Sequence, residues 1–165
     1  MNRPMTYRDL VPTFPDPTTW TLDQVLRHHA RVRPDALALE CPDESVTLTY
    51  AAGLADAERV ASGMLAAGGR PGDRVVLMAL NSSRFVRSWW ATAVSGLVEV
   101  PVNTNYEGEF LRHQVTVVQP RFAVIDDTYA ERFVAIKEQV RVIEEFWVID
   151  TGAGIHRSVL SFAMA

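Results

Sequence analysis

The alternation of hydrophobic and polar positions is clearest in the middle of the chain. A short, continuous apolar run at 75–80 is typical of a strand that is covered on both faces. Apolar residues then recur at helical spacing from 85 to 94, and a second apolar run follows directly and stops at Pro101. Asn81 occupies the position of a helix N-cap, and Gly96 occupies that of a left-handed helix end. The pattern therefore predicts a strand, a helix and a strand that form a right-handed parallel unit.

Further elements are predicted before this unit. Thr21 and Gln24 have the form of a capping box, in which side chains satisfy free backbone N–H groups at the start of a helix. This first helix ends at Pro34, because proline cannot continue it. Two short strands joined by a turn, and then a long helix that ends at paired glycines, are predicted at 36–40, 45–50 and 50–67.

The alternation of strands and helices continues after the central unit. Helical spacing places Leu65, Trp89 and Phe110 among the residues that face the core. The regular order from 74 to 150 predicts an α/β fold with a doubly wound, mainly parallel sheet. Its later elements are a helix that begins after 103–106 and ends at Pro120, a strand at 122–125, a helix at 129–140 and a strand at 146–149.

This pattern divides the chain into three parts. Residues 1–20 contain four prolines and are predicted to form an extended N-terminal arm. Residues 21–150 carry the alternating elements and form the α/β unit. Residues 151–165 do not continue the alternation, because 151–154 indicates a turn and the last eleven residues have the form of an irregular, truncated tail.

Composition narrows the classes of partner and the expected location. A net charge of −4 without a basic cluster gives no reason to expect nucleic acid or an anionic membrane surface as a partner. No stretch has the roughly 18–20 apolar residues of a membrane span, and prolines interrupt the region where a signal peptide would lie. The single cysteine, Cys41, excludes an internal disulfide and is typical of a reducing compartment, so we expect a cytoplasmic protein.

Ligands of open parallel sheets bind outside the carboxyl ends of the strands. The predicted ends offer amides, a phenol and carboxylates, but no histidine, no lysine and no nucleophile held beside a base. Asp126 and Asp127 could form an acid pair for a metal ion, as in a phosphoacceptor receiver, but such a site needs a lysine at another strand end. Lys137 lies within a predicted helix, so a helix cap is the favoured interpretation of the aspartates. The four predicted ends are 80–81, 102–106, 125–128 and 150–154.

Two other candidate motifs are incomplete. Gly152 and Gly154 match the start of a dinucleotide-binding loop, but Arg157 stands where the last glycine of that loop is required. His28 and His29 have no acid, cysteine or further histidine at ligand spacing on the same helical face. The residues alone therefore predict an α/β body without a complete active site.

Six short segments occur in the order and spacing of one known family: 48–50, 72–77, 81–82, 100–103, 108–114 and 123–126. On these segments the sequence resembles the N-terminal part of the adenylate-forming acyl- and aryl-CoA synthetases. This superfamily also includes luciferase and the adenylation domains of peptide synthetases. The resemblance extends over 21–150, and 101–114 is most similar to the carnitine/crotonobetaine-CoA ligase-like branch.

The resemblance implies a two-step reaction. Members of the family activate a carboxylate with Mg-ATP to an acyl-adenylate, release pyrophosphate, and then transfer the acyl group to the thiol of coenzyme A. The family's phosphate loop and its small C-terminal domain, each with a lysine, have no counterpart in this chain, and Lys137 matches neither lysine. We therefore expect an N-terminal portion that is inactive alone and binds no ATP, magnesium or coenzyme A by itself. Its expected partner is the missing C-terminal part of the enzyme or a second copy of the chain.

The resemblance also indicates where the chain could touch a ligand. Asn103, Asn105 and Tyr106 are candidates for a rim on the substrate or coenzyme A side, whereas no catalytic and no metal-binding residue is expected. In some family members a basic residue at the position of Asn105 reaches the coenzyme A nucleotide, and here that position is uncharged. Two alternatives stay open: a non-catalytic α/β binding module that associates with a partner lobe, and an independent nucleotide-binding domain that rests on topology only.

Overall fold

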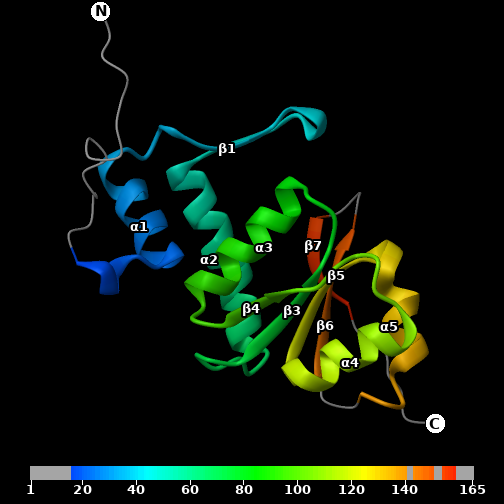
Figure 1. Cartoon of the computed structure of the whole chain (residues 1–165). Coiled ribbons are helices and arrows are strands. Elements are labelled where there is room, and N and C mark those ends of the chain that lie inside the picture. Colours follow the sequence, from blue (N-terminus) through cyan, green and yellow to red (C-terminus); the bar gives the residue numbers. More distant parts are fainter. Residues whose placement is uncertain (1–15, 141–142, 151–153, 159–165) are drawn as a thin grey trace, which may run out of the picture.

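A five-stranded sheet in the order β4-β3-β5-β6-β7 forms the centre of the fold (Figure 1). The computed structural model describes residues 16–140, 143–150 and 154–158. Neighbouring strands among β3 to β6 are parallel, and only β7 runs antiparallel to its neighbour β6. The strands are β3 (Arg74–Met78), β4 (Val98–Pro101), β5 (Phe122–Asp126), β6 (Glu145–Asp150) and β7 (Gly154–Ser158).

Helices cover both faces of this sheet, as the alternating pattern predicts. Met64 of α2 and Ala91 of α3 belong to the hydrophobic core on one face, together with Leu77 of β3. Leu111 of α4 and Phe133 of α5 belong to the core on the other face. The chain therefore has the predicted doubly wound α/β fold. The covering helices are α2 (Tyr50–Ala66), α3 (Ser83–Val94), α4 (Gly108–Val118) and α5 (Ala130–Ile136).

A smaller layer lies beside α2 and α3 and confirms the predicted N-terminal elements. Leu26 is buried in a third cluster with Ala57 and Trp90, and so joins the first helix to α2 and α3. The two short strands pair antiparallel in a sheet of their own. Within the described ranges, no helix is long and apolar enough to cross a membrane. The elements of this layer are α1 (Leu22–Val32), β1 (Leu37–Cys41) and β2 (Val46–Thr49), and short 3-10 helices lie at Pro17–Thr19, Pro42–Glu44 and Asp127–Tyr129.

Helix ends follow the local sequence with one correction. The Thr21 hydroxyl accepts a hydrogen bond from the backbone N–H of Gln24, as the capping box predicts. Gly96 has φ of 74°, which confirms the predicted left-handed end. Asn81, however, is not the cap of α3. Ser82 takes that position, and its hydroxyl accepts from the N–H of Phe85 at 3.1 Å.

Small residues share the buried side of α3 with Phe85 and Ala91, which pack in the core on the sheet. Ser88 and Thr92 are buried, and their hydroxyls donate to the carbonyls of Arg84 and Ser88 one turn earlier. Because these small residues occupy the inner face of the helix, Trp89 turns outward and is 45% exposed. The predictions that Leu65, Trp89 and Phe110 face the core are therefore wrong, since all three are exposed.

The expected irregular tail is wrong for residues 154–158. This segment forms β7, in register with β6 from Asp150↔Gly154 to Phe146↔Ser158. An edge strand needs no continuous apolar run, so the mainly polar composition of β7 gave no strand signal. The rest of the predicted tail, at 151–153 and 159–165, and residues 1–15 of the predicted arm lie outside the described residues.

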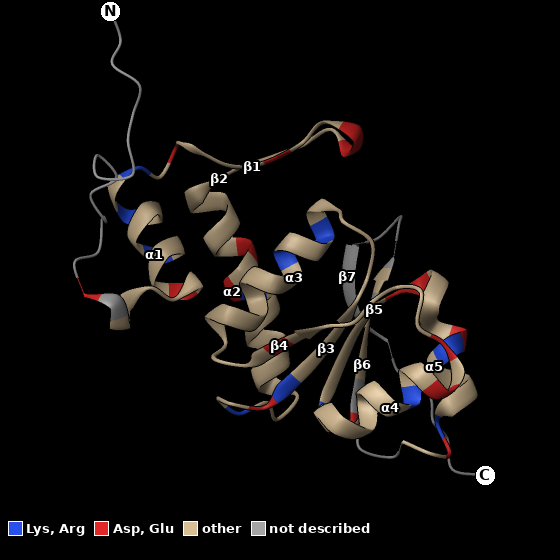
Figure 2. Cartoon of the chain, viewed as in Figure 1, with Lys and Arg blue, Asp and Glu red and all other residues tan. Residues whose placement is uncertain are grey.

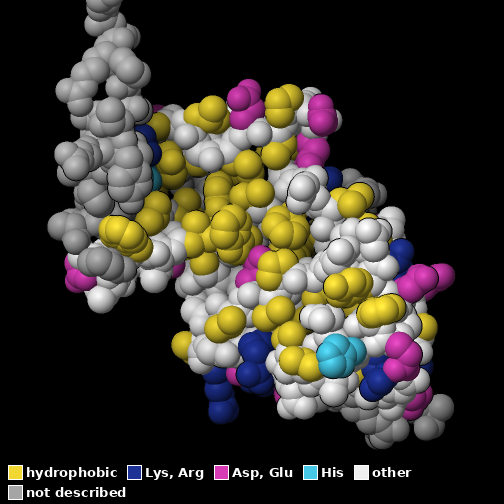
Figure 3. Space-filling model, viewed as in Figure 1, with side chains coloured by type: hydrophobic (Ala, Val, Ile, Leu, Met, Phe, Trp, Pro, Cys, Tyr) yellow, Lys and Arg dark blue, Asp and Glu magenta, His cyan; other side chains and the backbone are white. Residues whose placement is uncertain are grey.

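The surface has both charged and hydrophobic regions. Figure 2 shows charged residues of both signs on the helices and at strand ends, and β4 carries an acidic residue, Glu99. Figure 3 shows hydrophobic side chains gathered on one face of the molecule, from the region of α2 and α3 down to β4.

A group of ion pairs lies at the amino ends of the central strands. Arg121 donates to the carbonyl of Gly68 at 2.6 Å and to the carboxylates of Asp73 and Glu144. Those ion pairs join the amino ends of three strands and have a structural role.

Candidate functional site

The loop that follows β4 brings the three predicted rim residues into one turn. The side-chain oxygen of Asn103 accepts a hydrogen bond from the N–H of Asn105 at 2.9 Å, and the carbonyl of Asn103 accepts from the N–H of Tyr106 at 3.0 Å. Asn103 and Asn105 are exposed, whereas Tyr106 is half-buried and packs against the core beside α4 and α5. We call residues 103–107 the rim loop. The side-chain oxygen of Asn103 is thus used within the turn, although both asparagines are exposed.

An aromatic stack continues from the rim loop onto α4. The ring of Tyr106 lies 6.0 Å from the ring of Phe110 between centroids, with an angle of 27° between the planes. Phe110 is exposed, so this stack forms an apolar border beside the neutral amides. The arrangement can bind a flat or apolar group, but it provides no acid, base or nucleophile.

Arg132 of α5 holds the rim loop in place, and the sequence analysis missed it. Its guanidinium donates to the backbone carbonyls of Thr104 and, at 3.2 Å, of Tyr106. The same group lies over the ring of Tyr129, 4.9 Å from the centroid. The sequence did contain a signal for this contact. A basic residue near the start of the helix after β5 lies at the same sheet edge as the rim loop and can reach it. Because Arg132 binds loop carbonyls, this cation positions the loop.

Of the two aspartates after β5, Asp126 caps the short 3-10 helix Asp127–Tyr129, which agrees with the favoured interpretation. Asp126 accepts hydrogen bonds from the N–H of Thr128 at 3.2 Å and from its hydroxyl at 2.9 Å. Among the residues that the structure describes, no three His, Cys, Asp or Glu side chains come together as a possible metal site.

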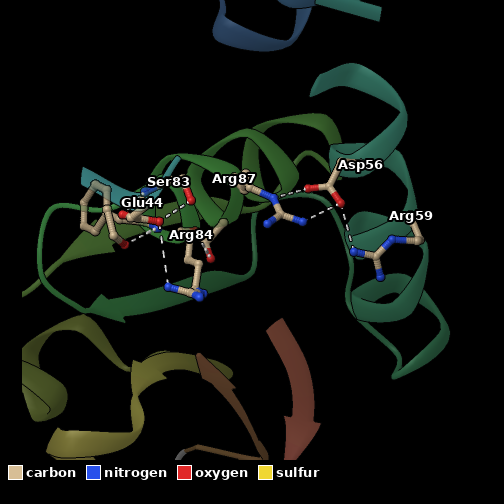
Figure 4. A network of polar contacts seen from close by, with 9 residues as sticks. Glu44, Asp56, Arg59, Ser83, Arg84 and Arg87 are labelled. Atoms are coloured by element: carbon tan, nitrogen blue, oxygen red, sulfur yellow. Dashed lines mark hydrogen bonds and ion pairs between the residues drawn. The ribbon is translucent and has the colours of Figure 1, made fainter. Parts of the chain in front are cut away.

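An acidic side chain from the β1–β2 turn fills the exit of β3 (Figure 4). The carboxylate of Glu44 accepts from the N–H of Ser83 at 2.9 Å and from the Ser83 hydroxyl at 2.5 Å, at the start of α3. Arg84 lies 3.8 Å from the same carboxylate. The hydrogen bonds from Ser83 are the main reason that the pKa of Glu44 is lowered. This helix start, a common anion site in other folds, is thus occupied by the chain's own carboxylate.

A second polar group in Figure 4 joins α2 to α3. Arg87 donates two hydrogen bonds to Asp56, at 2.6 and 2.9 Å, and Arg59 donates a third at 2.9 Å. Burial works to raise the pKa of Asp56, but the bonds from Arg87 and Arg59 outweigh it and lower that pKa. Every polar atom of this carboxylate faces an arginine, so the group supports the helix pair and has no free edge for a ligand.

Glu99 is an ionisable side chain that is partly buried and takes part in none of these contacts. It lies in the edge strand β4, in register with Val75 of β3, whose side chain is in the core beneath α2 and α3. Its Oε2 atom is buried and has no hydrogen-bond partner among the described residues. Burial raises the pKa of Glu99 to about 7. A buried carboxyl oxygen without a partner indicates that a hydrogen-bond donor from outside the described residues belongs beside it. The hydrophobic periodicity of the sequence did not indicate that Glu99 would be buried.

These features define a class of protein: an α/β domain with an exposed amide rim, in which the described residues form no complete catalytic centre. The family model described as AMP-binding enzyme matches residues 26–161. The chain belongs to this family of AMP-binding enzymes.

Two of the similar curated proteins are named as acyl-CoA ligases. The chain is 32% identical over 99 residues to the mitochondrial medium-chain acyl-CoA ligase ACSF2 of Danio rerio, a match over 60% of this chain and 16% of ACSF2. It is 40% identical over 80 residues to the long-chain-fatty-acid–CoA ligase FadD13 of Mycobacterium tuberculosis, over 48% of this chain and 16% of FadD13. The first relatives match over only 16–21% of their own length.

Solved structures agree with the fold. The inhibitor-bound N-terminal domain of FACL13 from Mycobacterium tuberculosis superimposes with a TM-score of 0.72 at 27% identity, over 78% of this chain and 33% of that domain. ATP-bound MatB from Rhodopseudomonas palustris superimposes with a TM-score of 0.67 at 28% identity, over 81% of this chain and 26% of MatB. The chain therefore matches part of the N-terminal domain of acyl-CoA ligases, and its family includes a protein that binds ATP.

Proposed function

We propose that this chain is the N-terminal portion of an ATP-dependent acid–CoA ligase. In such an enzyme a carboxylate reacts with ATP to give an acyl-adenylate and pyrophosphate, and the acyl group then forms a thioester with coenzyme A. The observation that carries the proposal is the superposition of the chain on the N-terminal domain of FACL13, together with the match of the family model over 26–161.

The residues present do not fit a complete site for Mg-ATP. The described residues contain no cluster for a metal ion. The chain's one lysine, Lys137, lies just beyond the end of α5, and the rim loop contains no lysine. Phosphoryl transfer needs cations that neutralise developing charge. We therefore assign no catalytic step to this chain, and we propose that the chain is inactive alone.

The rim loop is the part of the chain that we propose to meet substrate or coenzyme A. Asn103 and Asn105 present neutral amides at the carboxyl ends of the strands, and Tyr106 adds an aromatic surface beside them. Neutral amides form hydrogen bonds but do not neutralise phosphate, so we propose that the two asparagines contribute orientation rather than charge. The likeness of 101–114 to the carnitine branch and the cytoplasmic location remain predictions.

Pyrophosphate release tests the proposed function. The full 165-residue chain is incubated with ATP, magnesium, coenzyme A and a panel of carboxylic acids. We expect no acid-dependent release of pyrophosphate from the chain alone. Fusion of the chain to the part of FACL13 that follows the matched region should restore acid-dependent release. Turnover by the chain alone, or a folded fusion without turnover, would contradict the proposal.

A non-catalytic binding module is the second candidate function. The observation that favours it is the exposure of large apolar side chains, including Trp89 of α3 and Val98 of β4, which a partner lobe would cover. On this alternative the chain forms a stable complex with a partner but no fusion or mixture releases pyrophosphate. Calorimetric titration with ATP and with NAD separates both candidates from an independent nucleotide-binding domain, because only the last predicts heat of binding by the chain alone.

A further inference from the structure

The outer edge of β4 is an unusual sheet margin. Of the described strands, only β3 pairs with β4, so the other side of this strand has no partner there. Val98 is 47% exposed, although it lies in a strand of the central sheet. Pro101 has no N–H to offer a further strand, and Glu99 places a carboxyl group in the middle of this short element. The edge is therefore poorly suited to extension by another strand.

Exposed apolar side chains nevertheless occur on β4 and on α3, the helix that packs on it. Successive strand residues point to opposite faces, and Glu99 is in register with Val75 on the α3 side. Val98 consequently points to the α4 side. Trp89 is exposed on α3, the helix that packs on β3 and β4. We call Trp89, Val98 and Glu99 the β4 surface, and the hydrophobic region of Figure 3 extends down to this strand.

We propose that the β4 surface is the docking site for the polypeptide that completes the ligase N-terminal domain, and that this partner donates a hydrogen bond from an arginine, a lysine or a backbone N–H to Glu99. The inference rests on the proposed function and identifies the surface through which this chain would contact the rest of the ligase domain. Trp89 and Val98 supply the apolar contact area, and the buried Oε2 of Glu99 supplies the specific polar contact.

The length of the solved domain identifies this occupant. The chain covers only 33% of the FACL13 N-terminal domain, so about two thirds of that domain lies outside the matched region and packs somewhere around it. A second copy of the chain is a poorer occupant. Symmetric contact through β4 would bring one Glu99 toward another, so at least one of the two carboxyl groups would have to be protonated, and this cost opposes association at neutral pH and above. Pro101 further opposes pairing of two β4 strands.

Capture during co-expression tests the proposal. The full chain, carrying an affinity tag, is co-expressed with the part of the FACL13 N-terminal domain that follows the matched region. As a positive control, the matched region of FACL13 itself carries the same tag. Its capture of the probe shows that the probe can bind a native partner. The decisive pair is V98D and V134D, because Val98 and Val134 are 47% and 42% exposed and Val134 lies on α5, away from β4. E99Q is compared with E131Q, a change at an exposed residue of α5.

We expect the unmodified chain and both α5 variants to capture the probe. V98D and E99Q should reduce capture by about ten-fold, as is usual for central interface positions. W89S provides a second apolar variant if V98D is unfolded by circular dichroism. Lack of capture by the unmodified chain, or equal capture by V98D and V134D, overturns the docking site. A homodimer of the chain alone that V98D dissociates also overturns it. Capture that depends on the β4 surface, together with no pyrophosphate from the folded fusion to all of FACL13 that follows the matched region, overturns the proposed function and leaves the docking site standing.

Discussion

At the scale of single residues, two glycines determine how closely α2 approaches its neighbours. A Cβ atom at Gly53 would lie 2.5 Å from the ring of Trp90, and one at Gly63 would lie 2.7 Å from the ring of Trp147. Both rings are buried, so neither can move away without disturbing the core. The two glycines are therefore packing positions, although glycine weakens an isolated helix.

Substitution of Gly53 tests this packing. G53A gains about 1 kcal/mol of helix propensity but should destabilise the protein by a net ~1–2 kcal/mol, because overpacking against Trp90 costs more. Urea denaturation measures the change. The exposed substitution S62A in the same helix should stay within about 0.5 kcal/mol. In a W90L background the cost of G53A should disappear, and an unchanged cost there would show that the ring contact is not its cause.

Glu99 gives the second prediction at this scale. Burial raises its pKa to about 7, so the folded state binds the proton more tightly than the unfolded state does. The free energy of unfolding is therefore highest below the ordinary pKa of 4.5 and falls as the pH rises toward 7. In the chain alone, E99Q should raise that free energy by on the order of 1 kcal/mol near pH 8, after allowance for partial exposure, and by little near pH 4.5. Equal effects of E99Q at the two pH values in urea denaturation would contradict the assignment.

At the scale of elements, one carboxylate adds a polar link between the β1–β2 hairpin and α3, beside the apolar contacts of the third cluster. Glu44 accepts from the backbone N–H and the hydroxyl of Ser83, across 39 positions of sequence. The hairpin otherwise forms a separate two-stranded sheet, and such a sheet is marginally stable alone. The contact therefore couples the hairpin to the first turn of α3.

Removal of this carboxylate should loosen both elements. We expect E44A to lower the free energy of unfolding by about 1–2 kcal/mol near pH 7, because Ser83 loses charge-assisted hydrogen bonds. D43A, an exposed change in the same turn, is the matched control and should have little effect. The lowered pKa of Glu44 means that its contribution is present above 4.5 and is lost as the pH falls through the lower folded value. A cost of E44A that persists in strong acid would contradict this contact.

The rim loop depends on α5 in a comparable way. R132M removes the donor that holds the carbonyls of Thr104 and Tyr106, so the loop should open more often while the sheet stays folded. Hydrogen exchange at the N–H groups of Asn105 and Tyr106 should accelerate by about ten-fold. R112M, which removes an ion pair on the surface of α4, should leave those rates unchanged. Equal acceleration by both variants would show that Arg132 does not position the loop.

At the scale of the whole molecule, oppositely shifted carboxyl groups set the pH of greatest stability. Because the pKa values of Glu44 and Asp56 are lowered, these groups stabilise the fold at pH values above the ordinary pKa of a carboxyl group. Because the pKa of Glu99 is raised, this group destabilises the fold as the pH rises toward 7. We expect the free energy of unfolding of the chain alone to be greatest near about pH 5. Denaturation across the acid to neutral range measures this. E99Q should move the maximum upward, and a maximum above pH 7 in the unmodified chain would contradict the argument.

Local patterns predicted most of the fold because they are local. The continuous apolar strands β3 and β5 and the cap at Thr21 each depend on a few neighbouring residues. The contact between Glu44 and Ser83 depends on distant segments that the sequence does not bring together by itself, and the predicted cap at Asn81 failed because Ser82 satisfies the same need one residue later.

The candidate site was predicted less completely for the same reason. Asn103, Asn105 and Tyr106 follow a strand directly, so their position at the sheet edge could be predicted. Arg132 reaches their loop from another element, and the burial of Glu99 depends on how α3 lies on the sheet. Both features arise from tertiary packing, which hydrophobic periodicity does not encode.

The reversed direction of β7 constrains the path of any polypeptide that follows it. Because β7 is antiparallel to β6, Ser158 lies at the amino end of the parallel strands, opposite the rim loop. It also lies on the sheet margin opposite β4, about 19 Å away across four strand spacings. A chain that continues from Ser158 and docks on the β4 surface must therefore wrap around the whole sheet. The segment that completes the domain would then span the sheet from one margin to the other.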